Sequence, residues 1–144
     1  LYQKLVLKEQ KVDALSVAFD DQIDPELFTV LARVKDPSAV SYVRDQIIET
    51  FNRFTREPIS QEKLDETRAH IRYSTALNWT SAGAIAGFLA PYLNLAPTPA
   101  TVDRLFANYQ QITPKDIVDA AKRYFSPENR TVVALQNKPQ AEAK

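Results

Sequence analysis

Hydrophobic and polar residues alternate in two neighbouring segments near the start of the chain. The alternating apolar positions are Leu15, Val17 and Phe19 in the first segment and Phe28, Val30, Ala32 and Val34 in the second. A spacing of two places such side chains on one face of a β-strand, and the connection around residues 21–25 is short, polar and contains a proline. The pattern therefore predicts an antiparallel hairpin over residues 12–34.

Elsewhere the apolar positions recur every three or four residues, which is typical of amphipathic helices. The sequence predicts a short helix over residues 1–9 and a long helix that starts after Asp36-Pro37 and ends at Glu57-Pro58. A helix rich in small residues is expected from Ala82, after a break near residues 78–81. Another helix is expected over residues 101–111, where Val102, Leu105, Phe106 and Tyr109 form the predicted buried set.

Three of the predicted helices begin at side chains that can accept hydrogen bonds from the first helical turn. Asp36-Pro37 and Thr113-Pro114 each place a side-chain acceptor before a proline at the first helical position. Ser60 caps another helix, and Asp116 stands where the acid of a capping box would stand. The helix that begins after Thr113 is expected to bury Ile117, Ala120, Ala121 and Tyr124 and to stop at Ser126-Pro127.

The final apolar run, Arg130–Leu135, predicts a third, closing strand. Strands that do not alternate one for one with helices indicate an α+β fold, with helices packed on one face of a mainly antiparallel sheet. Three strands are few for so many helices, so further strands are expected before Leu1 and the chain is expected to be truncated at its N-terminus. We expect one domain over residues 1–137 and a flexible tail over residues 138–144.

Composition excludes several classes of function. Lys+Arg and Asp+Glu both number 18, so no basic excess indicates nucleic acid as a partner. The absence of cysteine excludes a disulfide, and the single histidine excludes any site in this chain that needs two histidines. The two glycines cannot form a phosphate-binding loop, and no apolar run reaches the ~20 residues of a membrane span.

Few side chains are placed for acid–base or metal chemistry. His70 has no second histidine one turn away, so a surface or packing histidine is favoured over a general base. Glu62, Asp65 and Glu66 cluster on one predicted helix, where interleaved basic residues favour an exposed, ion-paired face over a catalytic pair. A further acidic group lacks the spacing of a calcium loop and predicts a turn. Its members are Asp20, Asp21, Asp24 and Glu26.

Two apolar groupings also have structural interpretations. Gly83 and Gly87 form a small-xxx-small pattern, which in this chain predicts close helix packing. Trp79, with Tyr73 and Tyr92, is expected in the core, and a binding patch is the less favoured alternative. We therefore assign no catalytic residue and no metal ligand, and the substrate-binding residues stay unknown.

Five segments, in this order along the chain, carry a resemblance to a known family. They are residues 1–9, 25–30, 58–64, 112–117 and 123–133, of which the last two are the most specific. Together they are similar to the C-terminal domain of one half of an M16 (insulinase/pitrilysin-type) zinc metallopeptidase. The resemblance extends over nearly all of residues 1–135 and implies a metallohydrolase-like (mitochondrial processing peptidase-like) fold.

The resemblance implies a non-catalytic domain that helps to enclose and position peptide substrates. In that family zinc is held in a catalytic domain by a His-x-x-Glu-His motif and a distal Glu, and this chain contains no such motif. The implied partners are a catalytic M16 domain or subunit, a peptide substrate and a homo- or hetero-dimeric copy. Arg72-Tyr73 does not match the context of the family's substrate-holding pair and is not assigned that role. Peptides are expected to add a strand to an exposed sheet edge.

Two alternatives remain open. One is a structural core subunit of a larger assembly without a proteolytic role, which a nearby His-x-x-Glu-His sequence upstream would argue against. The other is an unrelated helical binding module, which a sheet of fewer than three strands would favour. The compartment stays open, with the periplasm favoured over the cytoplasm by the resemblance alone.

Overall fold

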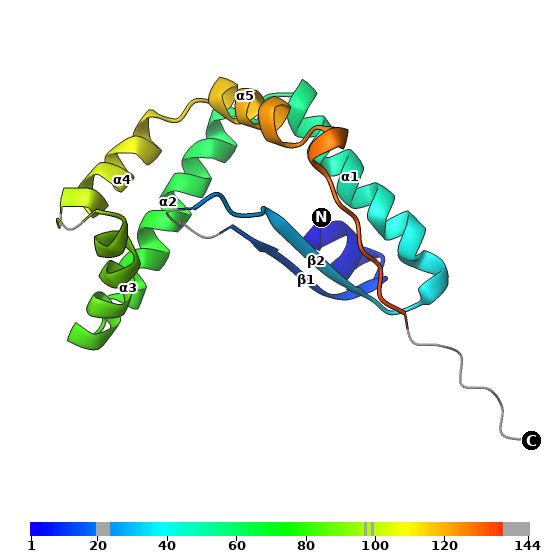
Figure 1. Cartoon of the computed structure of the whole chain (residues 1–144), viewed down its shortest axis with the longest axis horizontal. Helices are drawn as coiled ribbons and strands as arrows, with labels where there is room; N and C mark the ends of the chain where they lie inside the picture. The colour runs from blue at the N-terminus through cyan, green and yellow to red at the C-terminus, as the bar shows by residue number, and fades with distance from the viewer. Residues whose placement is uncertain (20–23, 97, 99, 137–144) are drawn as a thin grey trace, which may run out of the picture.

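A computed structural model describes residues 1–19, 24–96, 98 and 100–136 of the chain (Figure 1). In chain order its elements are a π-helix η1 (Gln3–Lys8), strands β1 (Val12–Ala18) and β2 (Thr29–Val34), a 3-10 turn η2 (Pro37–Ala39), helices α1 (Val40–Arg56), α2 (Gln61–Asn78), α3 (Ala82–Leu95), α4 (Ala100–Gln111) and α5 (Pro114–Tyr124), and a 3-10 turn η3 (Pro127–Asn129). The α+β class is confirmed. Most of the predicted turn at residues 21–25 and the predicted tail at residues 138–144 lie outside the described residues.

The predicted hairpin is confirmed, because β1 and β2 pair antiparallel. Val12 faces Val34 across the pair, but Ala14 faces Arg33, so Asp13 is an extra residue that makes a bulge in β1. The side chain of the bulge residue Asp13 stabilises the bulge, because it accepts a hydrogen bond from Arg33 Nε of β2 at 2.8 Å. This hydrogen bond lowers the pKa of Asp13.

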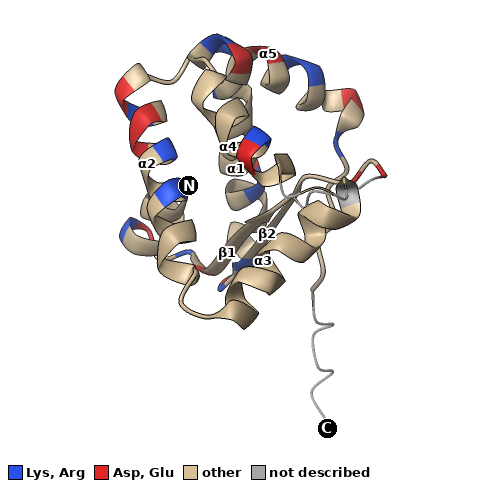
Figure 2. Ribbon diagram, turned by 90° about the vertical axis from the view of Figure 1, so that its left-hand side faces the viewer, with Lys and Arg blue, Asp and Glu red and all other residues tan. Residues whose placement is uncertain are grey.

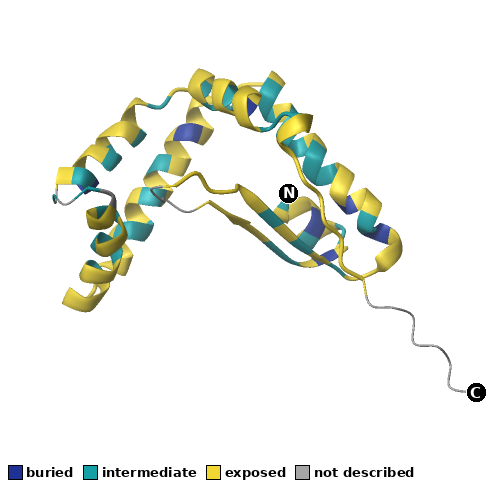
Figure 3. Cartoon of the chain, in the orientation of Figure 1, coloured by how far each residue is buried: buried dark blue, intermediate teal, exposed yellow. Residues whose placement is uncertain are grey.

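Helices pack on one face of the hairpin. Leu5 of η1, Val12 of β1 and Val43 of α1 are fully buried against one another. Partly buried side chains surround them; these are Leu1, Val6, Leu15, Ala32, Val34 and Ile47. Figure 3 shows that burial is concentrated at this junction and that much of the remaining surface is exposed.

A second cluster, made of phenylalanines, joins the other end of the hairpin to α1 and to the end of α5. The ring centroid of Phe28 lies 5.5 Å from that of Phe51 and 5.1 Å from that of Phe125. Phe51 and Phe125 are 4.8 Å apart and meet edge to face, a favourable aromatic geometry. Because Phe125 follows α5 directly, this cluster holds the last helix against α1 and the hairpin.

The predicted helix starts are confirmed by their hydrogen bonds. Asp36 Oδ1 accepts from the N–H of Ser38 at 2.9 Å, and Ser60 Oγ accepts from the N–H of Lys63 at 3.1 Å. Thr113 and Asp116 form the complete capping box, with each side chain bonded to the backbone N–H of the other residue. The break between two helices is also confirmed, because α2 ends at Asn78 and α3 begins at Ala82.

Helices α2, α3 and α4 form an arm beside the hairpin (Figure 1). Arg68, on α2, ties this arm together. Its guanidinium donates to the carbonyl oxygen of Tyr109 at 2.9 Å and to that of Gln110 at 3.0 Å, and it also donates to that of Ile112. These carbonyls lie at and just beyond the C-terminal end of α4, so a side chain of α2 caps another helix.

Two expectations are wrong. Residues 130–136 form no strand, and Val132, Val133 and Leu135 are 54%, 76% and 94% exposed. A β-prone sequence becomes a strand only where its backbone finds a ladder partner, and the described sheet consists of β1 and β2 alone. The predicted buried face of α5 is correct at Ala121, which is buried. Ala120 and Tyr124, which were expected on the same face, are exposed because no described element covers that side of the helix.

Candidate functional site

The hairpin offers two strand edges as its candidate binding site. Within the described residues β1 and β2 each have a single strand neighbour, so one side of each backbone has no ladder partner. Such an edge presents N–H and C=O groups that an extended chain can pair with. β1 forms the outer margin of the hairpin in Figure 1 and is seven residues long.

Apolar side chains lie close to this edge. Val17 and Phe19 are 53% and 60% exposed, although they follow the same alternation as the partly buried Leu15. Phe19 lies 6.4 Å from Phe28, measured between ring centroids, and so extends the phenylalanine cluster toward the surface. A strand that added to β1 would bring alternate side chains onto these exposed apolar groups.

The acidic residues of α2 form an exposed, ion-paired surface. Lys63 Nζ lies 2.8 Å from Glu66 Oε2, and Arg68 Nη1 lies 2.6 Å from Asp65 Oδ1. The hydrogen bond to Glu66 raises the pKa of Lys63. Glu62 and His70 are both exposed. The structure therefore places these sequence candidates on one helix without gathering them in a cleft.

The aromatic candidates are only partly brought together. Trp79 meets Phe88 edge to face at 5.4 Å between ring centroids, and Phe88 lies 5.3 Å from Tyr92. Tyr73, in contrast, is 70% exposed. The predicted core position is wrong for Tyr73 and also for Trp79, which is 40% exposed, because no described element fully covers either side chain.

The predicted close packing at Gly83 and Gly87 is also wrong within the described chain. A Cβ atom built on Gly87 would meet nothing within 4 Å, and one built on Gly83 would meet only Ser81 Oγ at 4.0 Å. The pattern requires a second helix at short range, and α3 presents its glycines to open space instead.

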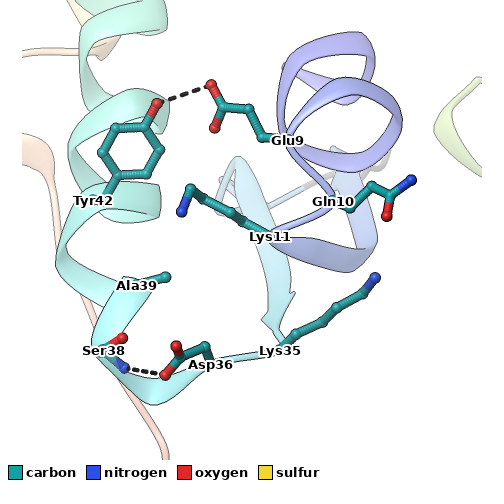
Figure 4. A pocket seen from close by; sticks show the side chains of 8 residues that line it. All are labelled: Glu9, Gln10, Lys11, Lys35, Asp36, Ser38, Ala39 and Tyr42. Carbon is teal, nitrogen blue, oxygen red and sulfur yellow. Dashed lines mark hydrogen bonds between the residues drawn. The ribbon is translucent and has the colours of Figure 1, made fainter.

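A hollow of about 620 Å³ lies where the end of η1 meets the start of α1. Figure 4 shows its lining side chains, which are Glu9, Gln10, Lys11, Lys35, Asp36, Ser38, Ala39 and Tyr42. Tyr42 Oη donates to Glu9 Oε1 at 2.9 Å, and Lys11 Nζ lies 5.4 Å from the centre of the Tyr42 ring, a cation–π distance. No local sequence pattern predicts this contact, because Glu9 and Tyr42 are 33 positions apart.

Uncharged neighbours hydrogen-bond both carboxylates of this hollow, Tyr42 to Glu9 and Ser38 to Asp36, while Glu9 Oε2 is buried with no hydrogen-bond partner among the described residues. The backbone N–H of Ser38, and then its hydroxyl, lower the pKa of Asp36 by hydrogen bonding to the carboxylate. Two carboxylates and two ammonium groups line the hollow, so it has no excess of either charge. The hydrogen bond from Tyr42 to Glu9 in this hollow joins α1 to the end of η1.

The described residues contain no group of three His, Cys, Asp or Glu side chains arranged to hold a metal ion, so the residues present do not fit the zinc that the resemblance implies for the family. Among the same residues, no helix is both long enough and apolar enough to cross a bilayer. The chain matches no family model, no curated protein and no solved structure.

Proposed function

We propose that this chain is a non-catalytic domain of an M16-type zinc metallopeptidase, or of an inactive homologue, with the metallohydrolase-like fold of that family. It helps to enclose a peptide and to position it for proteolysis by zinc held in another domain or subunit. The five segments named above carry the resemblance, and the antiparallel hairpin with helices on one face agrees with it at the level of fold class.

The observation that carries the proposal is the edge of β1, which has no ladder partner in the described part of the chain and lies beside exposed apolar side chains. Main-chain hydrogen bonds to an edge hold a peptide in the extended form with little regard to its sequence, while alternate side chains add selectivity. A domain that encloses peptide substrates needs binding of this sequence-independent kind, because it must present many peptides in one conformation. The step performed by this chain is binding and orientation, and no bond is broken on it.

A peptide-binding measurement by hydrogen exchange tests the proposal. We expect a fluorescently labelled, extended 12-residue peptide to slow amide exchange in residues 12–18 of β1. The matched control is the same peptide with alternate amide nitrogens methylated, because it keeps its side chains but cannot complete the ladder. Equal protection by both peptides, or protection confined to the helices, would contradict edge binding.

A turnover assay tests the non-catalytic assignment separately. The purified chain is expected to cleave no peptide, with or without added zinc. Metal-dependent cleavage that persists through purification and disappears on chelation would refute the assignment.

One observation favours a second candidate, the unrelated helical binding module. The described sheet has two strands, which is fewer than the three expected for the M16-type domain. A module of this kind would recognise its partner through the arm formed by α2, α3 and α4, and peptides would leave the exchange of β1 unchanged.

A further inference from the structure

The helix-covered face of the hairpin is open along the edge of β1. Leu15 and Val17 of β1 lie opposite Ala32 and Val30 of β2, and side chains that lie opposite each other share one face of a sheet. Ala32 and Val30 are both half-buried, whereas Val17 is 53% exposed. Among the described residues, the cover that the helices provide therefore reaches β2 but leaves the second half of β1 open.

Phe19 continues this open row just beyond the end of β1. Its position keeps the alternation of Leu15 and Val17, and its side chain is 60% exposed. Its ring meets that of Phe28, which contacts Phe51 of α1, so Phe19 lies on the side of the hairpin that α1 covers. We call Val17 and Phe19 together the apolar margin of β1.

The opposite face of β1 carries small side chains, which are Ala14, Ser16 and Ala18. Figure 2 shows charged residues of both signs on α2 and α5, but within β1 and β2 only Asp13 and Arg33 are charged. These two side chains pair with each other at 2.8 Å, and Arg33 lies opposite Ala14, on the face away from the apolar margin. The two faces of the edge therefore differ, because one has an uncharged apolar margin and the other has small side chains beside an ion pair.

We infer that the edge of β1 selects peptides in which apolar residues recur at every second position. A strand that adds to β1 directs its side chains alternately to the two faces of the sheet. Side chains on the helix-covered face come to lie beside Val17 and Phe19, where apolar groups leave water together and a charged group finds no partner. Side chains on the other face lie beside alanine and serine and stay in water.

Val17 and Phe19 are thus the specificity-determining residues of the edge, while the backbone ladder supplies the binding that all peptides share. Cross-strand pairs of aromatic and β-branched side chains contribute modestly to the stability of a sheet, so the expected preference is modest as well. The substrate class is an extended peptide of alternating apolar and polar residues. This inference rests on the proposed function, because it assigns a substrate class to the same edge.

Fluorescence anisotropy with two labelled 12-residue peptides tests the inference on the whole 144-residue chain. Both peptides contain Val, Phe, Ser and Lys in equal numbers. Apolar and polar residues alternate in the first peptide, and the second arranges the same residues as apolar pairs and polar pairs. We expect the alternating peptide to bind about fivefold more tightly, because only this peptide places apolar side chains beside both residues of the apolar margin.

Variants of the apolar margin separate selectivity from binding. Phe19→Ser is expected to reduce the preference for the alternating peptide to below about twofold, and Val17→Thr, which keeps the shape of the side chain, is expected to reduce it in part. Leu31→Ser is the matched control, because Leu31 is also 60% exposed but lies opposite Ser16, on the other face. It is expected to leave the preference unchanged. Circular dichroism checks that all three variants fold.

A lysine scan of the alternating peptide gives an independent measurement. A lysine placed at each position in turn is expected to weaken binding at every second position and to leave it unchanged at the positions between. This period of two distinguishes a peptide bound as a strand from one bound as a helix, because only in a strand do successive side chains point to opposite faces.

Several results would overturn the inference. They are equal affinity of the wild-type chain for the two peptides, equal weakening of both peptides by Phe19→Ser, the same loss of preference in Leu31→Ser, and lysine effects without a period of two. If both peptides slow amide exchange in residues 12–18 equally, edge binding stands and the selectivity alone fails. If neither peptide binds, the proposed function and this inference fail together.

Discussion

Arg68 is the residue that most clearly joins two elements by itself. Its side chain is only 16% exposed and also contacts Asp65. Three backbone carbonyls at the end of α4 accept from it, and carbonyls at a helix C-terminus have no partner within their own helix. A planar guanidinium can reach several acceptors at once, which an ammonium group cannot do in the same way.

Arg68→Ala is therefore expected to lower the free energy of unfolding by about 2 kcal/mol, because hydrogen bonds to a charged group are lost and carbonyls are left without a donor. Urea unfolding followed by circular dichroism measures the change. The control is Arg72→Ala, one turn further along α2, where the side chain is exposed. Arg68→Lys should recover only part of the loss. Equal effects at both positions would show that the carbonyl contacts contribute little.

Gly87 is expected to weaken α3, since a glycine inside a helix costs conformational entropy. A Cβ atom at this position meets no atom of the described residues within 4 Å, so Gly87→Ala is expected to raise the free energy of unfolding by about 1 kcal/mol. Thermal and urea unfolding of dilute protein measure this. Gly83→Ala, in the first turn of α3, should gain less. A loss of stability at Gly87 would reveal a close neighbour of the helix.

At the scale of elements, the sequence predicted most reliably what short-range contacts decide. The caps at Asp36, Ser60 and Thr113 were predictable because each acceptor bonds an N–H only two or three residues away. The absence of a strand at residues 130–135 was not predictable in the same way, because the ladder partner of a strand must come from elsewhere in the fold. The same limit applies to Tyr73, since its burial depends on what covers α2.

The capping box of α5 makes a pH-dependent contribution to stability. The Thr113 hydroxyl and backbone N–H both donate to the Asp116 carboxylate, at 2.7 Å each, and thereby lower its pKa. A carboxylate with a lowered pKa in the folded state stabilises the protein above its unfolded pKa, and this stabilisation is lost as the pH falls through the folded pKa.

Asp116→Asn is accordingly expected to destabilise the protein near neutral pH and to have a smaller effect in acid. Asparagine keeps a neutral acceptor, so the comparison isolates the charge. Urea midpoints of the two proteins, measured near neutrality and below the usual aspartate pKa of ~3.9, give the difference. Other carboxylates titrate in both proteins, so their effects on the two urea midpoints cancel in the difference. A difference that stays constant with pH would mean that the carboxylate charge does not contribute.

At the scale of the whole molecule, the described residues divide into a well-packed part and a sparsely packed one. The hairpin, η1 and α1 share three fully buried side chains, and the phenylalanine cluster attaches α5 to them. Among the described side chains of the arm, only Leu64 on α2 and Val102 on α4 are buried. Local opening is easiest where few apolar contacts must be broken.

Amide exchange should therefore be fastest, among the helices, in α3. We expect α3 to exchange through local opening in dilute protein, while the middle of α1, around Val43 and Ile47, exchanges only through global unfolding. Hydrogen-exchange mass spectrometry resolves the two helices. Protection of α3 equal to that of α1 would show that the arm is held as firmly as the hairpin and α1.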